Sequence, residues 1–136
     1  GGVWEKTKYM GRELAGRTLG IVGFGRIGRE VATRARAFDM QVIAYDPMYD
    51  SAGEGFSWVR MVKRDDLFAQ ADVITLHVPL TKDTKDSIGA REFSLMRKDA
   101  ILVNCARGGV VNEEALFAAL SGGTIRGAAT DVSVME

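Results

Sequence analysis

The sequence predicts an α/β fold, a doubly wound parallel sheet with helices on both faces. Short apolar runs alternate with amphipathic segments along the chain. The runs are too short for helices and rich in β-branched residues, which is typical of strands buried on both faces of a parallel sheet. A glycine-rich turn follows the first run, where such folds place a ligand. Strand and helix in regular alternation indicate a sheet built by crossover connections.

Five apolar runs are the predicted strands. They are Leu19–Val22, Val42–Tyr45, Val73–Val78, Ile101–Val103 and Ile125–Ala129. Between them, residues 26–38, 64–71, 90–97 and 112–122 place apolar side chains at helical spacing.

The first and last of these helices carry the clearest local signals. The helix over 26–38 is expected to bury Ile27, Val31 and Ala35 and to turn its arginines outward. Asn112 is placed to cap the last helix, whose first turn is acidic and therefore favourable at the positive end of the helix dipole. A further helix is expected in the segment 4–16, broken at Gly11.

Composition and charge narrow the class of protein. The 136 residues amount to one domain, with 46% hydrophobic and 26% charged residues. Eighteen basic and eighteen acidic residues give a net charge of zero without a basic stripe, so no nucleic-acid or membrane partner is expected. No apolar run approaches the roughly 20 residues of a membrane span. The single cysteine excludes an internal disulfide framework and a cysteine-built metal site, so we expect no metal and a cytoplasmic protein.

The turn after the first strand predicts a dinucleotide site. Gly23, Gly25 and Gly28 form a G-x-G-x-x-G pattern between a predicted strand and a predicted helix. Gly23 permits the tight turn, Gly25 lets the backbone approach a pyrophosphate, and Gly28 lets the helix pack closely on the sheet. Asp46 ends the next strand, where its carboxylate can accept hydrogen bonds from the ribose hydroxyls. Its charge would repel a 2′-phosphate, which favours NAD over NADP.

The backbone N–H groups around Arg26 and Ile27 would point at the pyrophosphate, helped by the helix dipole, and Arg26 would add a positive charge. The alternative is that the glycines only make a turn and that Asp46 opens another, since Asp-Pro is a common turn sequence.

Polar residues follow three other predicted strands. His77 is the only histidine, and a single histidine at a strand end is more often a packing or hydrogen-bonding residue than a catalytic one. Arg107 is followed by two glycines and can clamp a carboxylate through its planar guanidinium, although a surface arginine in a glycine turn has the same spacing. Cys105 is interpreted as a small buried hydrophobe. Asp131 stands at the end of the last predicted strand.

Together these segments resemble a known family. The stretches "GRTLGIVGFGRIGREVATRARAFDMQVIAYDP", "ITLHVPLTKDT", "ILVNCARGGVVNEEAL" and "IRGAATDVSVME" resemble, in order and spacing, the Rossmann-type NAD-binding domain of the D-2-hydroxyacid dehydrogenases. The run "NCARGGVVNEEAL" is most similar to the phosphoglycerate dehydrogenase branch. The resemblance covers nearly the whole chain, so residues 1–136 are expected to be one NAD-binding domain.

The resemblance implies roles for individual residues. Arg26 and Ile27 would lie at the pyrophosphate, and Asp46 at the adenosine ribose. Arg107 corresponds to the catalytic arginine, and Glu136 to the carboxylate that orients the catalytic histidine and raises its pKa. Further cofactor positions are implied at His77, Val78, Pro79 and Thr84 in the loop over the adenine and ribose side, at Cys105, Ala106 and Arg107 beside the nicotinamide, and at Asp131 on its carboxamide.

The chain also departs from the family pattern. The catalytic histidine would lie beyond Glu136, and the substrate domain is missing, so we expect a fragment that binds NAD but is poorly active. Asp39 stands where the family often has glycine, and aspartate tolerates that left-handed conformation. Ser133 stands where the family usually has phenylalanine, which changes the expected packing under Glu136.

The parent protein is thus expected to transfer a hydride between NAD and a D-2-hydroxy acid, with D-3-phosphoglycerate as the expected substrate, and to form a homodimer. Two alternatives stay open. One is an NAD-sensing dimeric binding protein of the corepressor type, and the other is a scaffold that no longer holds the cofactor.

Overall fold

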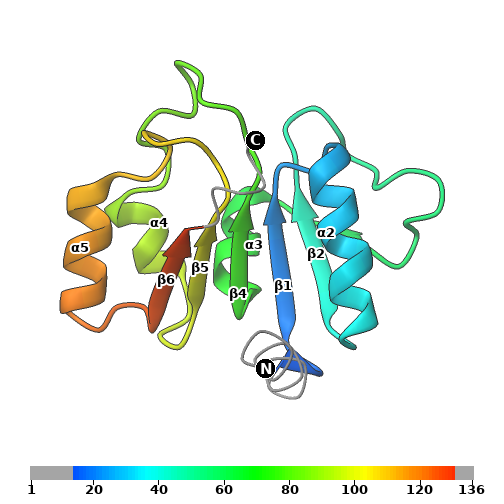
Figure 1. The fold of residues 1–136 in the computed structure, drawn as a ribbon, viewed down its shortest axis with the longest axis horizontal. Helices are drawn as coiled ribbons and strands as arrows, with labels where there is room; N and C mark the ends of the chain where they lie inside the picture. Colours follow the sequence, from blue (N-terminus) through cyan, green and yellow to red (C-terminus); the bar gives the residue numbers. More distant parts are fainter. Residues whose placement is uncertain (1–13, 131–136) are drawn as a thin grey trace, which may run out of the picture.

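A computed structural model describes residues 14–130, which form a six-stranded sheet with helices on both faces (Figure 1). The segments 1–13 and 131–136 lie outside the described residues, and with them the start of the expected first helix, Asp131, Ser133 and Glu136. The strands are β1 (Thr18–Val22), β2 (Gln41–Tyr45), β3 (Arg60–Met61), β4 (Val73–Leu76), β5 (Ile101–Asn104) and β6 (Gly127–Thr130). The helices are α2 (Arg26–Ala37), α3 (Arg64–Gln70), α4 (Ala90–Leu95) and α5 (Glu113–Ser121).

The sheet is parallel throughout and has the order β3-β2-β1-β4-β5-β6. The strands β1, β2 and β3 thus follow one another toward one edge of the sheet. The chain then crosses back to place β4 beside β1, and β5 and β6 follow toward the other edge. The order reverses between β1 and β4, and in open α/β sheets ligands bind at this point, beyond the carboxyl ends of the strands. The predicted fold class is confirmed.

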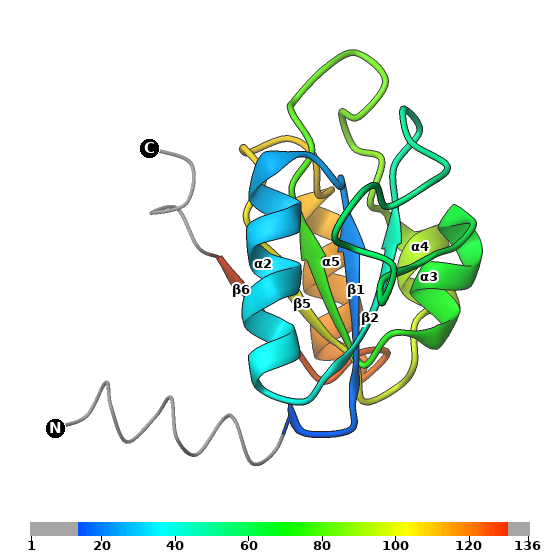
Figure 2. The ribbon, with the colours of Figure 1, turned by 90° about the vertical axis from the view of Figure 1, so that its right-hand side faces the viewer.

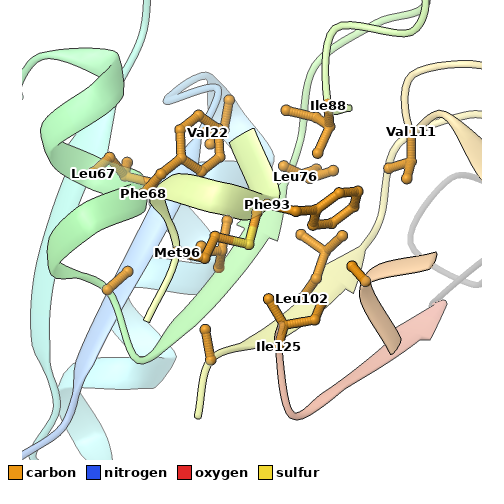
Figure 3. Close-up of a cluster of buried hydrophobic side chains, with 14 of the residues drawn as sticks. Val22, Leu67, Phe68, Leu76, Ile88, Phe93, Met96, Leu102, Val111 and Ile125 are labelled. Atoms are coloured by element: carbon orange, nitrogen blue, oxygen red, sulfur yellow. The ribbon is translucent and has the colours of Figure 1, made fainter. Parts of the chain in front are cut away.

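Two apolar clusters flank the sheet. Helix α2 packs on one face, where Ala32 and Ala35 join Leu19 and Ile21 of β1. Helices α3, α4 and α5 cover the other face (Figures 1 and 2). Figure 3 shows side chains of this second cluster. In it, Leu67, Phe68 and Phe93 of the helices pack with Leu76, Leu102 and Ile125. The burial of these large side chains is the dominant favourable contribution to folding.

Five of the six strands lie where the sequence places them, with ends shifted by one or two residues. The two-residue strand β3 was not predicted, because its pairing with β2 depends on where the preceding loop returns rather than on an apolar run. Burial on both faces was wrong for β6, whose last three residues are exposed. Among residues 14–130, β6 is an edge strand without a helix on its α2 side.

The predicted burial of α2 is confirmed for Ala35 but was wrong for Ile27. Ile27 is 39% exposed, while Gly28, Ala32 and Ala35 are buried. A Cβ at Gly28 would overlap the carbonyl oxygen of Gly23, so the helix lies too close to the turn for any larger residue at this position. This close packing rotates α2 away from the expected stripe and turns Arg29 toward the protein.

The local predictions at helix ends are confirmed. Asp39 follows α2 with φ 60°, a left-handed conformation that aspartate tolerates. The Asn112 side chain accepts a hydrogen bond from the Ala115 N–H at 2.9 Å and so caps α5. Within residues 14–130, no helix is long and apolar enough to cross a membrane.

Candidate functional site

The glycine turn joins β1 to α2 at the centre of the carboxyl edge. Gly23 has φ 96° and donates its N–H to the Tyr45 carbonyl at 2.8 Å. A Cβ at this position would lie 2.5 Å from the carbonyl oxygen of His77. The turn is thus wedged between the ends of β2 and β4, and only glycine fits there.

The space in front of this turn suits an anionic group. Gly25 is the N-cap of α2, and a Cβ built on it meets nothing within 4 Å, so bare backbone faces solvent. The first turn of α2 contains no acidic residue, and Arg26 and Ile27 are exposed. Unpaired N–H groups and the positive end of a helix dipole favour phosphate binding. These residues fit the pyrophosphate of a dinucleotide.

Asp46 lies beside the turn, at the end of β2. Its Oδ2 accepts a hydrogen bond from the Phe24 N–H at 2.7 Å, and its Oδ1 accepts one from the Met48 N–H at 2.8 Å. The side chain is half-buried. Two backbone donors fix the carboxylate, and each oxygen retains a lone pair for a further donor. The acid and the turn therefore form one unit.

His77 and Cys105 lie on the α2 side of the sheet. The His77 ring is 2.8 Å from the Thr75 hydroxyl, measured at Nε2, and the same hydroxyl is 3.6 Å from the Cys105 Sγ. The cysteine is 4% exposed, as expected for a small buried side chain. These three residues line one end of an apolar groove of about 270 Å³ between α2 and strands β4 and β5.

The loop after β4 runs from His77 to Gly89 over the carboxyl edge. Thr84 organises it, because its hydroxyl donates to the Pro79 carbonyl at 2.6 Å and accepts from the Thr81 N–H at 2.7 Å. Val78 is half-buried and Pro79 is exposed. The predicted cofactor positions of this loop therefore stand on a turn that is ordered by internal hydrogen bonds.

This loop is joined to the loop after β5. The Asp86 N–H donates to the Gly109 carbonyl at 2.6 Å, and the Ile88 N–H donates to the Val110 carbonyl at 3.1 Å. The Asn112 N–H donates back to the Ile88 carbonyl at 2.9 Å. In Figure 1 both loops rise from the same edge of the sheet, beside the glycine turn. These hydrogen bonds fix the positions of the two loops relative to each other.

Arg107 lies in the second of these loops. Its side chain is exposed, and its carbonyl accepts the Val110 N–H at 3.5 Å in a turn that includes Gly108 and Gly109. The preceding residue, Ala106, donates its N–H to the Asn104 Oδ1 at 3.0 Å. The guanidinium thus stands at the carboxyl edge, on a turn held by the end of β5.

Two arginines that hold the surrounding loops were not predicted from the sequence. Arg29 packs against aromatic rings beside Asp46. Arg64 of α3 donates to the Glu92 carboxylate and to the Ser87 carbonyl, both at 2.8 Å. Arg29 was expected to face solvent with the other arginines of its helix, and no role was predicted for Arg64. The only sequence signal was Glu92, an acid between apolar positions of α4.

Glu92 is 7% exposed and also accepts the Gly89 N–H at 3.0 Å. Burial alone would raise its pKa, but the hydrogen bonds from Arg64 and from the Gly89 backbone outweigh burial and lower the pKa below 4.5. The pair therefore anchors the end of the loop that carries Val78, Pro79 and Thr84.

Comparison with known proteins identifies the family. A model of the D-isomer specific 2-hydroxyacid dehydrogenase NAD-binding domain matches residues 1–136. The D-3-phosphoglycerate dehydrogenase of Methanocaldococcus jannaschii is 48% identical over 132 residues, which are 96% of this chain and 25% of the relative. The hydroxypyruvate reductase of Thermotoga maritima is 46% identical over 135 residues, which are 99% of this chain and 43% of the relative.

Solved structures agree with these relatives. The NAD-dependent formate dehydrogenase of Staphylococcus aureus, in complex with NAD, has a TM-score of 0.82 at 40% identity over 88% of this chain and 36% of its own. The NAD-complexed D-isomer specific 2-hydroxyacid dehydrogenase of Lactobacillus delbrueckii ssp. bulgaricus has a TM-score of 0.79 at 39% identity, over 85% of this chain and 35% of its own. The chain thus spans about a quarter of the length of the phosphoglycerate dehydrogenases it matches.

The prediction that the cofactor is NAD agrees with the family match and with the bare glycine turn beside Asp46. The chain belongs to the D-isomer specific 2-hydroxyacid dehydrogenase family, as an NAD-binding domain.

Proposed function

We propose that this domain holds NAD across the carboxyl edge of the sheet, with the glycine turn at the pyrophosphate and Asp46 at the adenosine ribose. The observation that carries the proposal is the unit formed by Gly25 and Asp46. A bare N-cap faces solvent at Gly25, and two backbone N–H groups orient the carboxylate of Asp46 beside it. This carboxylate accepts hydrogen bonds from the ribose hydroxyls, and its negative charge repels a 2′-phosphate.

The remaining cofactor contacts are assigned to the two joined loops. Val78, Pro79 and Thr84 cover the adenine and ribose side, and His77 begins their loop. Cys105 and Ala106 lie beside the nicotinamide, and Asp131, which lies outside the described residues, binds its carboxamide. The backbone bonds from Asp86 and Ile88 support this assignment, because they keep the two groups of residues in one arrangement.

In a longer protein, we propose that this domain serves a D-2-hydroxyacid dehydrogenase. Bound NAD supplies an acceptor for the hydride from C2 of the hydroxy acid. Arg107 holds the substrate carboxylate through its exposed guanidinium and polarises the carbonyl that forms. Glu136, also outside the described residues, is assigned to orient the proton-accepting histidine. His77, the only histidine of this chain, is assigned to the cofactor loop, so the proton-accepting histidine is proposed to belong to another segment of the longer protein.

D-3-phosphoglycerate is the proposed substrate. Support comes from phosphoglycerate dehydrogenases at 44–48% identity. A hydroxypyruvate reductase at 46% and a glycerate dehydrogenase at 45% are similarly close. Assays of D-glycerate beside D-3-phosphoglycerate, with a longer protein that contains this domain, distinguish a phosphoglycerate dehydrogenase from these two. A homodimer is also proposed, from the family resemblance, and sedimentation of the chain tests it.

Fluorescence titration with NADH tests the binding proposal directly. The folded chain is expected to bind NADH and to show little turnover of either acid. If a chain with native circular dichroism shows no binding up to millimolar NADH, the proposal is wrong.

A further inference from the structure

Arg29 packs among three aromatic rings, two of which belong to residues hydrogen-bonded to Asp46. The side chain is half-buried, and its guanidinium carbon lies 4.7 Å from the ring centre of Phe24, 5.1 Å from that of Tyr49 and 5.8 Å from that of Phe56. These distances are within the range of cation–π attraction. A helix residue expected to face solvent is thus turned toward the loop that follows β2.

The same guanidinium joins two separate segments by hydrogen bonds. Its Nη1 donates to the Phe24 carbonyl in the glycine turn, and its Nη2 donates to the Ala52 carbonyl at 3.2 Å in the loop over residues 47–58. Phe56 of that loop packs edge-to-face on Phe24, with ring centres 5.7 Å apart. Arg29 therefore clamps the loop against the turn from α2.

Asp46 lies between the two parts that Arg29 joins. Its Oδ2 accepts the Phe24 N–H and its Oδ1 accepts the Met48 N–H. Its carbonyl accepts the Tyr49 N–H at 3.3 Å. Phe24, whose N–H bonds the carboxylate, and Tyr49, whose N–H bonds the Asp46 carbonyl, both contact Arg29 through their rings.

We propose that Arg29 is a positioning and specificity-determining residue, which fixes the Asp46 carboxylate and thereby sets the preference for a ribose 2′-hydroxyl over a 2′-phosphate. The inference rests on the proposed function, in which Asp46 binds the ribose. A fixed carboxylate makes strong hydrogen bonds to the hydroxyls and cannot move away from a phosphate. Without the clamp, the acid can rotate outward, which weakens NADH binding and relieves the repulsion of NADPH.

Geometry, rather than charge, carries this role. The planar guanidinium donates in two directions at once while its face lies on aromatic rings, and a lysine ammonium cannot reproduce that arrangement. Lysine at this position would keep the positive charge but lose the clamp. Arg29→Lys should therefore lose as much preference for NADH over NADPH as Arg29→Met does. If the positive charge alone mattered, Arg29→Lys would keep the wild-type preference.

The test compares NADH and NADPH affinities of the chain with those of Arg29→Met and Arg29→Lys, together with melting temperatures. Arg34→Met is the matched control, since Arg34 lies on the same helix, is exposed and faces the apolar groove. We expect both Arg29 variants to bind NADH about tenfold more weakly, the effect of roughly one net hydrogen bond. NADPH affinity should change less than about twofold. The selectivity ratio, which is NADH affinity divided by NADPH affinity, should therefore fall.

Binding of ADP-ribose and of reduced nicotinamide mononucleotide locates the effect. The loss should appear with ADP-ribose, which contains the adenosine ribose, and not with the mononucleotide. If Arg29→Met does not fold, Tyr49→Ala removes one of the three rings at an exposed position and should lower the ratio in the same direction.

Three results with a folded Arg29 variant would overturn this inference but not the proposal that the chain binds NAD. They are an unchanged ratio of NADH to NADPH affinity, an equal loss of affinity for both dinucleotides, and a wild-type ratio in Arg29→Lys. Failure of the wild-type chain to bind NADH is a different outcome, and it overturns the proposed function together with this inference.

Discussion

The carboxylate of Asp46 accepts the backbone N–H of Phe24 at 2.7 Å, which joins the end of β2 to the glycine turn after β1. This contact places the acid in register with the N-terminus of α2. It also means that the acid and the turn cannot shift separately without leaving a buried N–H group unpaired.

Replacing Asp46 tests the ribose assignment. Asp46→Ala should weaken NADH binding by about 100-fold, since each hydrogen bond to a charged group contributes roughly 1.5–3 kcal/mol. Affinity for NADPH should fall far less, because the repelling charge is gone. Asp50→Ala, at an exposed position of the same loop, is the control. Equal NADH affinity in the wild type and in Asp46→Ala would exclude this carboxylate from the ribose site.

Two glycine substitutions separate cofactor approach from folding. A Cβ at Gly25 meets nothing within 4 Å, so Gly25→Ala should keep the wild-type melting temperature but lose NADH affinity, because the methyl group occupies the path to the backbone. A Cβ at Gly28 overlaps the Gly23 carbonyl, so Gly28→Ala should unfold at a lower temperature. Thermal melts and NADH titrations of both variants check this contrast. Tight NADH binding by Gly25→Ala would place the pyrophosphate elsewhere.

The Arg64–Glu92 pair should make the domain sensitive to acid. The pKa of Glu92 lies below 4.5 in the folded protein, so its contribution to stability is complete above about pH 4.5 and is lost as the pH falls through the lowered value. Glu92→Gln should cost about 2 kcal/mol at pH 7, the scale of a hydrogen bond between charged groups, and the difference from wild type should shrink as the pH falls through the lowered pKa. Urea unfolding at a series of pH values measures it.

Asp65→Asn is the matched control for this prediction. Asp65 also pairs with an arginine, Arg91, at 2.6 Å, and the hydrogen bond from Arg91 lowers the pKa of Asp65. Both side chains are at least half exposed, so water screens the pair and the variant should change stability little. A Glu92→Gln variant that is as stable as wild type at pH 7 would show that the buried pair does not stabilise the fold.

Asn112 connects the last helix with the joined loops. Asn112→Ala removes the N-cap of α5 and the bond from Asn112 Nδ2 to Asp86 Oδ1 at 3.4 Å, and should cost about 1 kcal/mol. Amide exchange should quicken in the first turn of α5, which loses its cap, and at Ile88. The Ile88 N–H donates to the Val110 carbonyl between the two joined loops, and these loops lose the side-chain bond from Asn112 to Asp86. Thr124→Ala, at an exposed position beyond the other end of α5, should leave both unchanged. Protection at Ile88 equal to wild type would contradict the coupling.

Much of the fold followed from local patterns. The apolar runs and amphipathic segments placed five strands and four helices, because burial and periodicity are visible in short stretches. The glycine pattern and the acid after the next strand indicated where a dinucleotide binds. The short strand β3 escaped prediction, since Arg60 and Met61 pair with β2 only through the return of a long loop.

The sequence by itself determined the order of the elements, the glycine turn and the acid at the end of β2, since each depends on residues close together in the chain. The tertiary structure decided which face of α2 is buried, where Arg29 points, and how Arg64 meets Glu92. Periodicity allows either Ile27 or Gly28 on the inner stripe of α2. The choice depends on how closely the helix approaches Gly23, a distance set by packing between elements and by no local pattern.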